Sequence, residues 1–197
     1  MKTLIIYAHP NPKSFNAAIC DTVQSEVKAQ GGEVRIHDLY KMNFDPVLKS
    51  DDFTELFDGR VPKDVQPLQD DIRWADMLVL IFPTWWVSVP ALMKGYFDRV
   101  LTNGFAFSYG PGGPEGLLKG KRAMVFQTTG TPGEVYSQTG MTRAMNMTSD
   151  VGVLNFCGVD VVAHEFFSAV PYVTDEERQG MLNLVREAVQ KAAPVTA

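Results

Sequence analysis

The sequence predicts a single α/β domain, a three-layer sandwich in which helices cover both faces of a five-stranded parallel sheet. Two observations lead to this prediction. Residues 3–7, 77–82 and 123–126 form short, continuously apolar runs, as expected of parallel strands that are covered on both faces. Helical patterns alternate with these runs, and such alternation implies right-handed crossovers in an open sheet. A chain of 197 residues has the size of one large domain, so residues 1–197 are expected to form one unit.

The other elements follow from hydrophobic spacing and from stop signals. Glu33–Asp38 alternates as a strand does, and Asp160–Phe167 supplies the fifth strand. Apolar or small residues recur on one helical face of Phe15–Ala29, and Gly31 and Gly32 end this helix. Further helices are predicted over residues 65–74, 89–101, 141–156 and 174–191. Three stretches rich in glycine, proline or threonine are predicted to be irregular: 40–50, 102–119 and 128–140.

The composition argues against several function classes. The formal net charge is −5 and no cluster of basic residues occurs, which argues against a nucleic-acid partner. No apolar run approaches the roughly 20 residues that cross a bilayer, so we expect no membrane insertion and a cytoplasmic location. Cys20 and Cys157 lie in apolar helical patterns without a partner at metal-ligand spacing. We therefore expect two buried free thiols and no metal site.

The first candidate site is the turn that follows the first predicted strand. It leads from a strand end directly into a helix, so free backbone N–H groups and the positive end of the helix dipole face any bound anion. Ser14 and Asn16 can add hydrogen bonds to a phosphate, and His9 and Lys13 can add charge or donors. The alternative is that Ser14 only caps the helix and His9 is a surface turn residue. The glycine-rich and Walker nucleotide motifs do not occur here.

The whole chain resembles a known family. Its matching segments, in chain order, are Ala8-His9-Pro10, Ser14-Phe15-Asn16, residues 82–95, residues 104–109, Thr128-Thr129-Gly130 with Tyr136-Ser137, and Phe156-Cys157-Gly158. These segments resemble the NAD(P)H:quinone oxidoreductases, the DT-diaphorase-like branch of the flavodoxin-like proteins. The resemblance implies a flavodoxin-like fold and a flavin cofactor, with NADH or NADPH as co-substrate.

The resemblance also implies where the flavin binds. The expected cofactor-binding residues are His9, Ser14, Phe15, Asn16, Pro83, Thr84, Trp85, Trp86, Val87, Thr128, Thr129, Gly130, Tyr136 and Arg178. Backbone N–H groups of Trp85, Trp86 and Val87 would face the flavin N5 and carbonyl edge, where fixed dipoles stabilise the charge that reduction creates. Trp86 and Tyr136 are the expected catalytic residues. An alternative places the paired tryptophans in the core or in a partner interface.

Tyr136 matches a family tyrosine that bonds near the flavin O2. In the diaphorases a histidine follows six residues later, whereas Thr142 occupies that position here. His37 and His164 lie elsewhere in the sequence. The resemblance therefore supports a neutral-donor role for Tyr136 and no tyrosine–histidine relay.

The remaining matches concern the acceptor and the type of flavin. Phe105, Phe107 and Tyr109 resemble an aromatic segment that roofs the catalytic cavity, often across a dimer interface, where a flat quinone can stack. A packed loop without contact to a substrate is the alternative. Arg178 aligns with an arginine that contacts the adenosine diphosphate part of FAD, so FAD is favoured, with FMN as the alternative.

The expected function is two-electron reduction of quinone-like small molecules by ping-pong hydride transfer in a homodimer. Reduction of azo or nitro compounds is an alternative that uses the same hydride half-reaction. A regulatory flavoprotein subunit of a potassium-efflux system is another. A one-electron flavodoxin carrier is disfavoured because the Thr- and Gly-rich phosphate loop of flavodoxins is absent.

Overall fold

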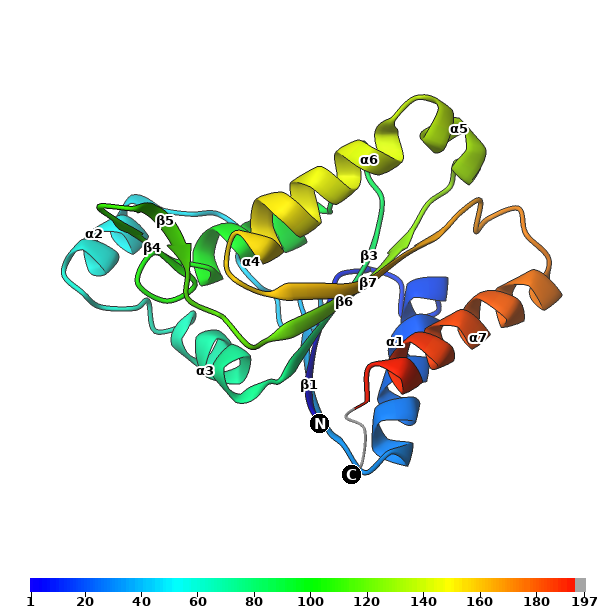
Figure 1. Cartoon of the computed structure of the whole chain (residues 1–197), viewed down its shortest axis with the longest axis horizontal. Coiled ribbons are helices and arrows are strands. Elements are labelled where there is room, and N and C mark those ends of the chain that lie inside the picture. Colours follow the sequence, from blue (N-terminus) through cyan, green and yellow to red (C-terminus); the bar gives the residue numbers. More distant parts are fainter. Residues whose placement is uncertain (194–197) are drawn as a thin grey trace.

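A computed structural model describes residues 1–193 and has a parallel sheet of five strands at its centre (Figure 1). The strands are β1 (Lys2–Tyr7), β2 (Glu33–Asp38), β3 (Met77–Pro83), β6 (Arg122–Thr128) and β7 (Asp160–Phe167). They lie in the order β2-β1-β3-β6-β7. Counted within this sheet alone the order is 2-1-3-4-5, which is that of flavodoxin-like doubly wound folds, so the predicted fold class is confirmed.

Burial explains why the central strands are so apolar. Every residue of β3 is buried, and β1 and β6 are open only at their first residue. The edge strands β2 and β7 are more exposed. Parallel pairing brings Pro83 opposite Thr128, so the carboxyl ends of β3 and β6 meet at one edge of the sheet.

Helices cover both faces of the sheet. α1 (Phe15–Ala29) packs against α7 (Asp175–Lys191) on one face, while α3 (Gln66–Trp74), α4 (Ala91–Val100) and α6 (Met141–Asn146) lie on the other (Figure 1). Each face has its own hydrophobic core because the buried strands point alternate side chains to opposite sides. The predicted helices are present, and each predicted end lies within two residues of the observed end.

Two predicted irregular stretches contain short regular elements. Residues 102–119 include an antiparallel hairpin of β4 (Phe107–Gly110) and β5 (Gly113–Gly116), so the prediction of an irregular segment was wrong there. Residues 128–140 include α5 (Gly133–Gln138). Both elements are too short to give a hydrophobic period that a sequence reading can detect.

Two helical features were not foreseen. α2 (Ser50–Phe57) follows the irregular stretch that ends at residue 50. The helix predicted over 141–156 begins as α6 and continues as a π-helix, η1 (Met147–Asn155). π-helical turns occur often at functional sites, so η1 is of interest for the chemistry below.

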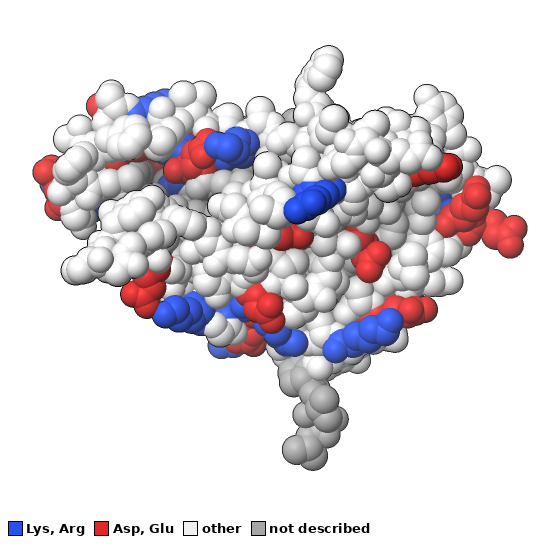
Figure 2. All heavy atoms as spheres, turned by 45° about the horizontal axis from the view of Figure 1, so that its top comes forward, with Lys and Arg blue, Asp and Glu red and all other residues white. Residues whose placement is uncertain are grey.

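The mixed surface charges and the two buried cysteines agree with what the composition leads us to expect. Figure 2 shows lysine, arginine, aspartate and glutamate interspersed on one face, with a large uncharged area above them. Within residues 1–193, no helix is long and apolar enough to cross a membrane. Cys20 and Cys157 are buried and free, and burial raises the pKa of their thiols to about 12 and about 11. Both thiols therefore stay protonated at neutral pH.

Candidate functional site

Three predicted segments meet at the carboxyl edge of the sheet: the start of α1, the loop after β3 and the loop after β6. The Thr84 N–H donates to the Thr128 carbonyl at 2.7 Å, which joins the last two loops. Asn16 Nδ2 donates to Thr128 Oγ1 at 2.8 Å, which joins them to α1. Asn16, Thr84 and Thr128 therefore form one connected group, although up to 112 positions separate them in the sequence.

Ser14 caps α1. Its Oγ accepts from the Ala17 N–H at 3.2 Å, as an N-cap serine should. His9 Nδ1 accepts from the Asn11 N–H at 3.0 Å, and burial lowers the pKa of the His9 ring. His9 is therefore neutral at pH 7 and can offer a hydrogen bond to a ligand but no charge. The positive field of this turn comes from the helix terminus and from Lys13, which lies exposed in the turn.

Asn16 carries a buried side-chain oxygen without a hydrogen-bond partner among the described residues. Its side chain lies in the first turn of α1 and the residue is only 3% exposed. Nδ2 bonds Thr128, but Oδ1 has no partner among the described residues. A buried polar atom without a partner costs about 1–3 kcal/mol, and a bound polar group that bonds to the amide removes this cost. Because Oδ1 is an acceptor, it fits a ligand hydroxyl, whereas a phosphate fits the free backbone N–H groups at the start of α1.

The loop after β3 contains a strained two-residue turn. Trp85 and Ser88 exchange backbone hydrogen bonds of 3.0 and 3.1 Å, and the residues between them, Trp86 and Val87, have φ of 53° and 55°. Asn-Gly normally fills such a turn, because a branched residue with positive φ is an outlier. Backbone strain of this kind clusters at ligand sites.

The same turn presents its tryptophans to solvent. Trp86 is 99% exposed and Trp85 is 42% exposed. The alternative that these side chains belong to the core is therefore wrong. They remain free to contact a ligand or a partner chain.

The loop after β6 is tied to the end of β7. The Thr129 N–H donates to the Phe167 carbonyl at 2.9 Å, and Thr129 Oγ1 donates to the Thr131 carbonyl at 2.7 Å. Gly130 is exposed at the tip, and Tyr136 lies half-buried on α5. This loop is therefore fixed at its base and open at its tip.

Two predicted binding residues are held on the α7 side of the sheet. Phe15 packs edge-on against Phe167 with ring centroids 6.0 Å apart, so it supports the turn from within the core. Arg178 Nη1 pairs with Asp175, and its Nη2 donates to the Val170 carbonyl at 3.0 Å. The Arg178 side chain is 31% exposed.

The predicted aromatic segment divides between core and cavity. Phe105 is 8% exposed, with the Arg73 guanidinium 4.6 Å from its ring centroid, so it belongs to the core. Phe107 instead packs against Phe156 at 5.3 Å and Tyr109 at 5.6 Å. The structure therefore keeps Phe107 and Tyr109 together and buries Phe105 in the core against which Phe107 packs.

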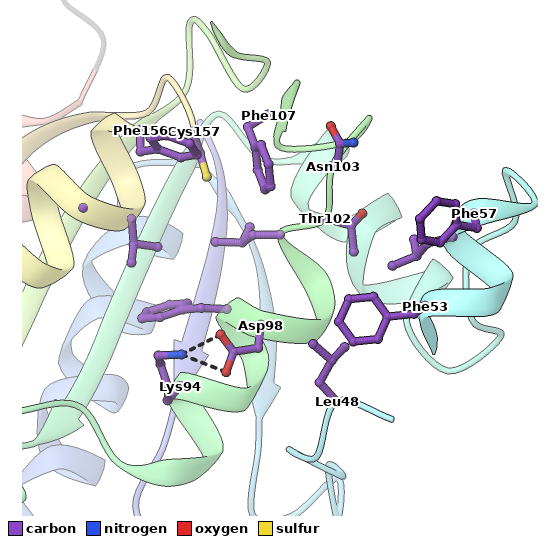
Figure 3. A pocket seen from close by; sticks show the side chains of 15 residues that line it. Leu48, Phe53, Phe57, Lys94, Asp98, Thr102, Asn103, Phe107, Phe156 and Cys157 are labelled. Atoms are coloured by element: carbon purple, nitrogen blue, oxygen red, sulfur yellow. Dashed lines mark hydrogen bonds and ion pairs between the residues drawn. The ribbon is translucent and has the colours of Figure 1, made fainter. Parts of the chain in front are cut away.

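Phe107 lines an apolar cavity of about 560 Å³ between α2, α4 and η1 (Figure 3). Phe53 and Phe57 of α2 form the opposite wall, and the Lys94–Asp98 ion pair of α4 is drawn to the left of Phe53 (Figure 3). Phe107 is the one predicted site residue among those that line the cavity. Within one chain, the predicted cofactor-binding segments and this cavity therefore lie at different places.

The sequence reading missed a polar chain behind the loop after β3. Buried Gln127 of β6 contacts Thr84, and His164 of β7 links Gln127 to Asp150 of η1. His164 had been set aside because it lies far from Tyr136 in the sequence. Its position on a strand directly beside β6 was the signal that could have placed it near the site.

Comparison with known proteins agrees with this arrangement. The profile of a family described as "Flavodoxin-like fold" matches residues 1–191. A Haemophilus influenzae protein named "Uncharacterized NAD(P)H oxidoreductase" is 37% identical over 191 residues, 96% of this chain and 95% of that protein. The human ribosyldihydronicotinamide dehydrogenase [quinone] is 37% identical over 201 residues, covering 92% of this chain and 87% of its own length.

A solved structure gives the same result. The NAD(P)H:quinone oxidoreductase of Methanothermobacter marburgensis superposes with a TM-score of 0.86 at 28% identity, covering 98% of this chain and 99% of that one. The resemblance found in the motifs is therefore confirmed across nearly the whole length. This chain belongs to the flavodoxin-like family of NAD(P)H oxidoreductases and quinone reductases, and it is an oxidoreductase.

Proposed function

We propose that this chain is a flavin-dependent NAD(P)H:quinone oxidoreductase that binds its cofactor at the carboxyl edge of the sheet. The observation that carries the proposal is the buried Asn16 amide with an unpartnered Oδ1, directly linked to Thr128. A flavin nucleotide offers the phosphate and hydroxyl groups that such a site needs, and the strained turn at Trp86 and Val87 lies at the same edge.

Bound flavin would supply the hydride-accepting ring nitrogen, which the twenty amino acids lack. Ser14, Asn16 and the first turn of α1 would hold the phosphate. The Trp85 N–H is taken by the Ser88 carbonyl, so the backbone N–H groups of Trp86 and Val87 would face the ring edge that becomes negative on reduction. Thr128, Thr129 and Gly130 would hold the opposite side of the ring, with Tyr136 as a neutral hydrogen-bond donor.

The reaction would proceed in two half-reactions at one place. A bound flavin would accept a hydride from NADH or NADPH and pass it to a quinone, which would gain a proton from solvent to become the hydroquinone. NAD(P)+ would leave before the quinone binds, so both ligands would use the same place. Trp86, being almost fully exposed, is free to cover either ligand.

We further propose a homodimer in which Phe107 and Tyr109 of one subunit cover the active site of the other. The support is that these aromatics lie beside the apolar cavity and not at the cofactor edge of their own chain. Light scattering on the purified protein should give twice the monomer mass of 21.8 kDa. A monomer at micromolar concentration would contradict this part of the proposal.

The type of flavin is a separate question. FAD is proposed because Arg178 matches an arginine that contacts the adenosine diphosphate part, and FMN is the alternative. The Arg178 guanidinium already bonds Asp175 and the Val170 carbonyl, which orients it but occupies part of its donor set. Heat release of the flavin followed by chromatography identifies which of the two is bound.

The binding edge is tested by replacing Ser14 and Asn16 together with alanine. We expect flavin affinity to fall at least tenfold, while loss of the helix cap costs only about 1 kcal/mol of folding stability. Asn155→Ala is the control, because this asparagine, like Asn16, donates one hydrogen bond from its Nδ2, here to the Val159 carbonyl, but lies at the end of η1. Unchanged affinity in the double variant would overturn the assignment of this edge.

Acceptor assays separate the alternatives in function. Turnover with benzoquinones that exceeds turnover with azo and nitro compounds supports the quinone reductase. The reverse preference would point to the azo or nitro reductase, and activity that depends on a co-purified membrane transporter would point to the regulatory subunit.

A further inference from the structure

A chain of buried polar side chains runs from η1 to the loop after β3. Asp150 accepts from His164 Nδ1 at 2.9 Å, His164 Nε2 lies 3.2 Å from Gln127 Oε1, and Gln127 Nε2 donates to Thr84 Oγ1 at 2.7 Å. Gln127 is 1% exposed, and the side chains of His164 and Asp150 are 6% and 13% exposed. The chain therefore joins η1, β7, β6 and the end of β3 without contact with bulk water at its centre.

The links hold for either orientation of the Gln127 amide. In the amide orientation of the structure, both ring nitrogens of His164 face acceptor oxygens and therefore donate. If the amide is turned by 180°, its NH₂ donates to Nε2 and the Thr84 hydroxyl donates to the amide oxygen. All three contacts are kept, so the connection does not depend on the protonation of His164.

Thr84 is the point where this chain reaches the candidate site. Its N–H donates to the Thr128 carbonyl, and its side chain bonds Gln127, so backbone and side chain are fixed from two directions. The next residues are Trp85 and the strained turn at Trp86 and Val87. A turn held against its own backbone preference needs an anchor of this kind at its base.

Burying this row of polar side chains costs folding stability, which indicates that they serve a function. A buried glutamine and a buried histidine each need every partner in place, and apolar side chains of similar volume would pack the same space without that requirement. Asp150, moreover, is supplied by a π-helix, a rare form that is found frequently at functional sites. Both features indicate a role beyond packing.

We propose that Gln127, His164 and Asp150 are positioning residues that lock Thr84 and thereby fix the N–H groups of Trp86 and Val87 against the bound flavin. The inference rests on the proposed flavin site. Because fixed N–H dipoles stabilise negative charge on the reduced cofactor, loss of the lock should weaken binding of reduced flavin more than binding of oxidised flavin. The midpoint potential should then become more negative.

The first test uses Gln127→Leu, with Gln69→Leu as the matched control. Gln69 is also fully buried and donates two hydrogen bonds, to the Val100 carbonyl and to Thr102 Oγ1, but it lies on α3. In apo-protein we expect faster amide exchange at Trp85 and Ser88 in Gln127→Leu only. In flavin-loaded protein we expect a tenfold loss in the affinity ratio for reduced over oxidised flavin, a potential about 30 mV lower for a two-electron couple.

A second pair of variants avoids any change in β6. His164→Gln keeps a donor near the position of Nε2 and should hold the wild-type potential more closely than His164→Asn, which keeps only the Nδ1 position.

Thr84→Val removes the last hydroxyl, and added to Gln127→Leu it should lower the potential no further, because both changes break the same link.

The outcomes separate this inference from the proposed function. Wild-type protein that binds neither FAD nor FMN overturns both. Wild-type protein that binds flavin, with Gln127→Leu and Thr84→Val matching it in potential and in amide exchange, overturns the lock alone. Equal shifts in Gln127→Leu and Gln69→Leu would also overturn it, because a general loss of stability would then explain the effect.

Discussion

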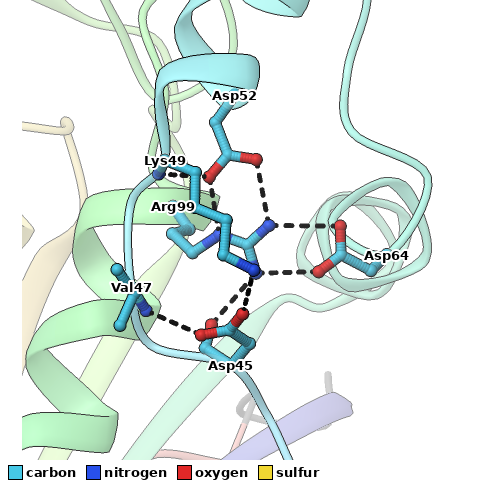
Figure 4. A network of polar contacts seen from close by, with 6 residues as sticks. All are labelled: Asp45, Val47, Lys49, Asp52, Asp64 and Arg99. Atoms are coloured by element: carbon cyan, nitrogen blue, oxygen red, sulfur yellow. Dashed lines mark hydrogen bonds and ion pairs between the residues drawn. The ribbon is translucent and has the colours of Figure 1, made fainter.

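Arg99 offers the sharpest test of how the structure is held together, because all five of its N–H groups are used inside the protein (Figure 4). Nε and Nη2 bond the Asp52 carboxylate at 3.0 and 3.1 Å, Nη1 and Nη2 bond Asp64 at 2.7 and 3.2 Å, and Nη1 donates to the Asp45 carbonyl at 3.0 Å. The Arg99 side chain is 4% exposed. One turn earlier on α4, a Cβ on Gly95 would lie 2.3 Å from Pro46, so α4 and this segment are in direct contact.

The expected cost of Arg99→Leu follows from what it leaves behind. The Asp52 side chain is 9% exposed and would keep only the Lys49 N–H at 3.0 Å. Removing one partner of a buried ion pair costs about 3–5 kcal/mol, because the other charge remains buried. At roughly 2–4 °C per kcal/mol for a chain of this size, the melting temperature should fall by about 10 °C.

Thermal and urea unfolding followed by circular dichroism measure this cost. Asp64→Asn should cost less than about 1 kcal/mol, because the Asp64 side chain is 59% exposed and water screens it. Arg99→Leu combined with Asp52→Leu should recover most of the loss, since no buried charge is then left unpaired and Asp64 is open to water. The reasoning is refuted if Arg99→Leu costs less than about 1 kcal/mol, or if the double variant is as unstable as the sum of both single variants.

The same pair predicts an acid dependence. The bond from Arg99 holds the pKa of Asp52 below its ordinary value of 3.8. A carboxyl with a lowered pKa in the folded state stabilises the fold fully above its unfolded pKa, and this stabilisation is lost as pH falls through the folded pKa. Stability of the wild type should therefore drop below about pH 4, and Arg99→Leu should show a shallower drop in the same range.

Two further predictions concern the candidate site. Replacing Trp86-Val87 by Asn-Gly should raise the free energy of unfolding of apo-protein by about 1–2 kcal/mol, because Asn-Gly suits a turn with two positive φ values. Flavin retention should fall in the same variant. Unaltered or lower stability in urea would mean that the turn is not strained. Tyr136→Phe should slow anaerobic reduction by NADH or NADPH less than tenfold in stopped flow. A loss above about a hundredfold, some 2.7 kcal/mol of barrier, would show that the hydroxyl takes part in the chemistry.

The sheet could be predicted from the sequence because burial on both faces leaves a plain signal. β3 is buried throughout, and its run of apolar residues has no other reading at that length. The edge strands β2 and β7 were found through alternation and through their place between helices. Their boundaries agree with the structure because turn residues or charged residues flank them.

The hairpin and α2 could not be predicted in the same way. β4 and β5 contain glycine and proline, and pair only with each other, so no buried face imposes a period on them. α2 has Phe53 and Phe57 at 52% and 91% exposure, so its apolar face lies at the large cavity and not in the core. α2 does have an amphipathic pattern, but its 8 residues are too few for that pattern to establish a helix from the sequence alone.

The candidate site also contains residues that the sequence could single out and contacts that it could not predict. Ser14, Asn16, Thr84 and Thr128 could be singled out because they lie in short motifs next to strand ends, which meet at one edge in any parallel sheet. The link from His164 to Gln127 joins residues 37 positions apart. Nothing local marks such a contact, since it depends on which strands are neighbours and on the depth of each side chain.

The central claim is that the carboxyl edge of the sheet holds a flavin that accepts hydride from NAD(P)H and passes it to a quinone. The most direct test is an absorbance spectrum of the purified protein, followed by anaerobic addition of NADH or NADPH and then of a benzoquinone. We predict a yellow protein that bleaches with the pyridine nucleotide and regains its colour with the quinone. A colourless protein that also fails to bind added FAD or FMN would contradict the account.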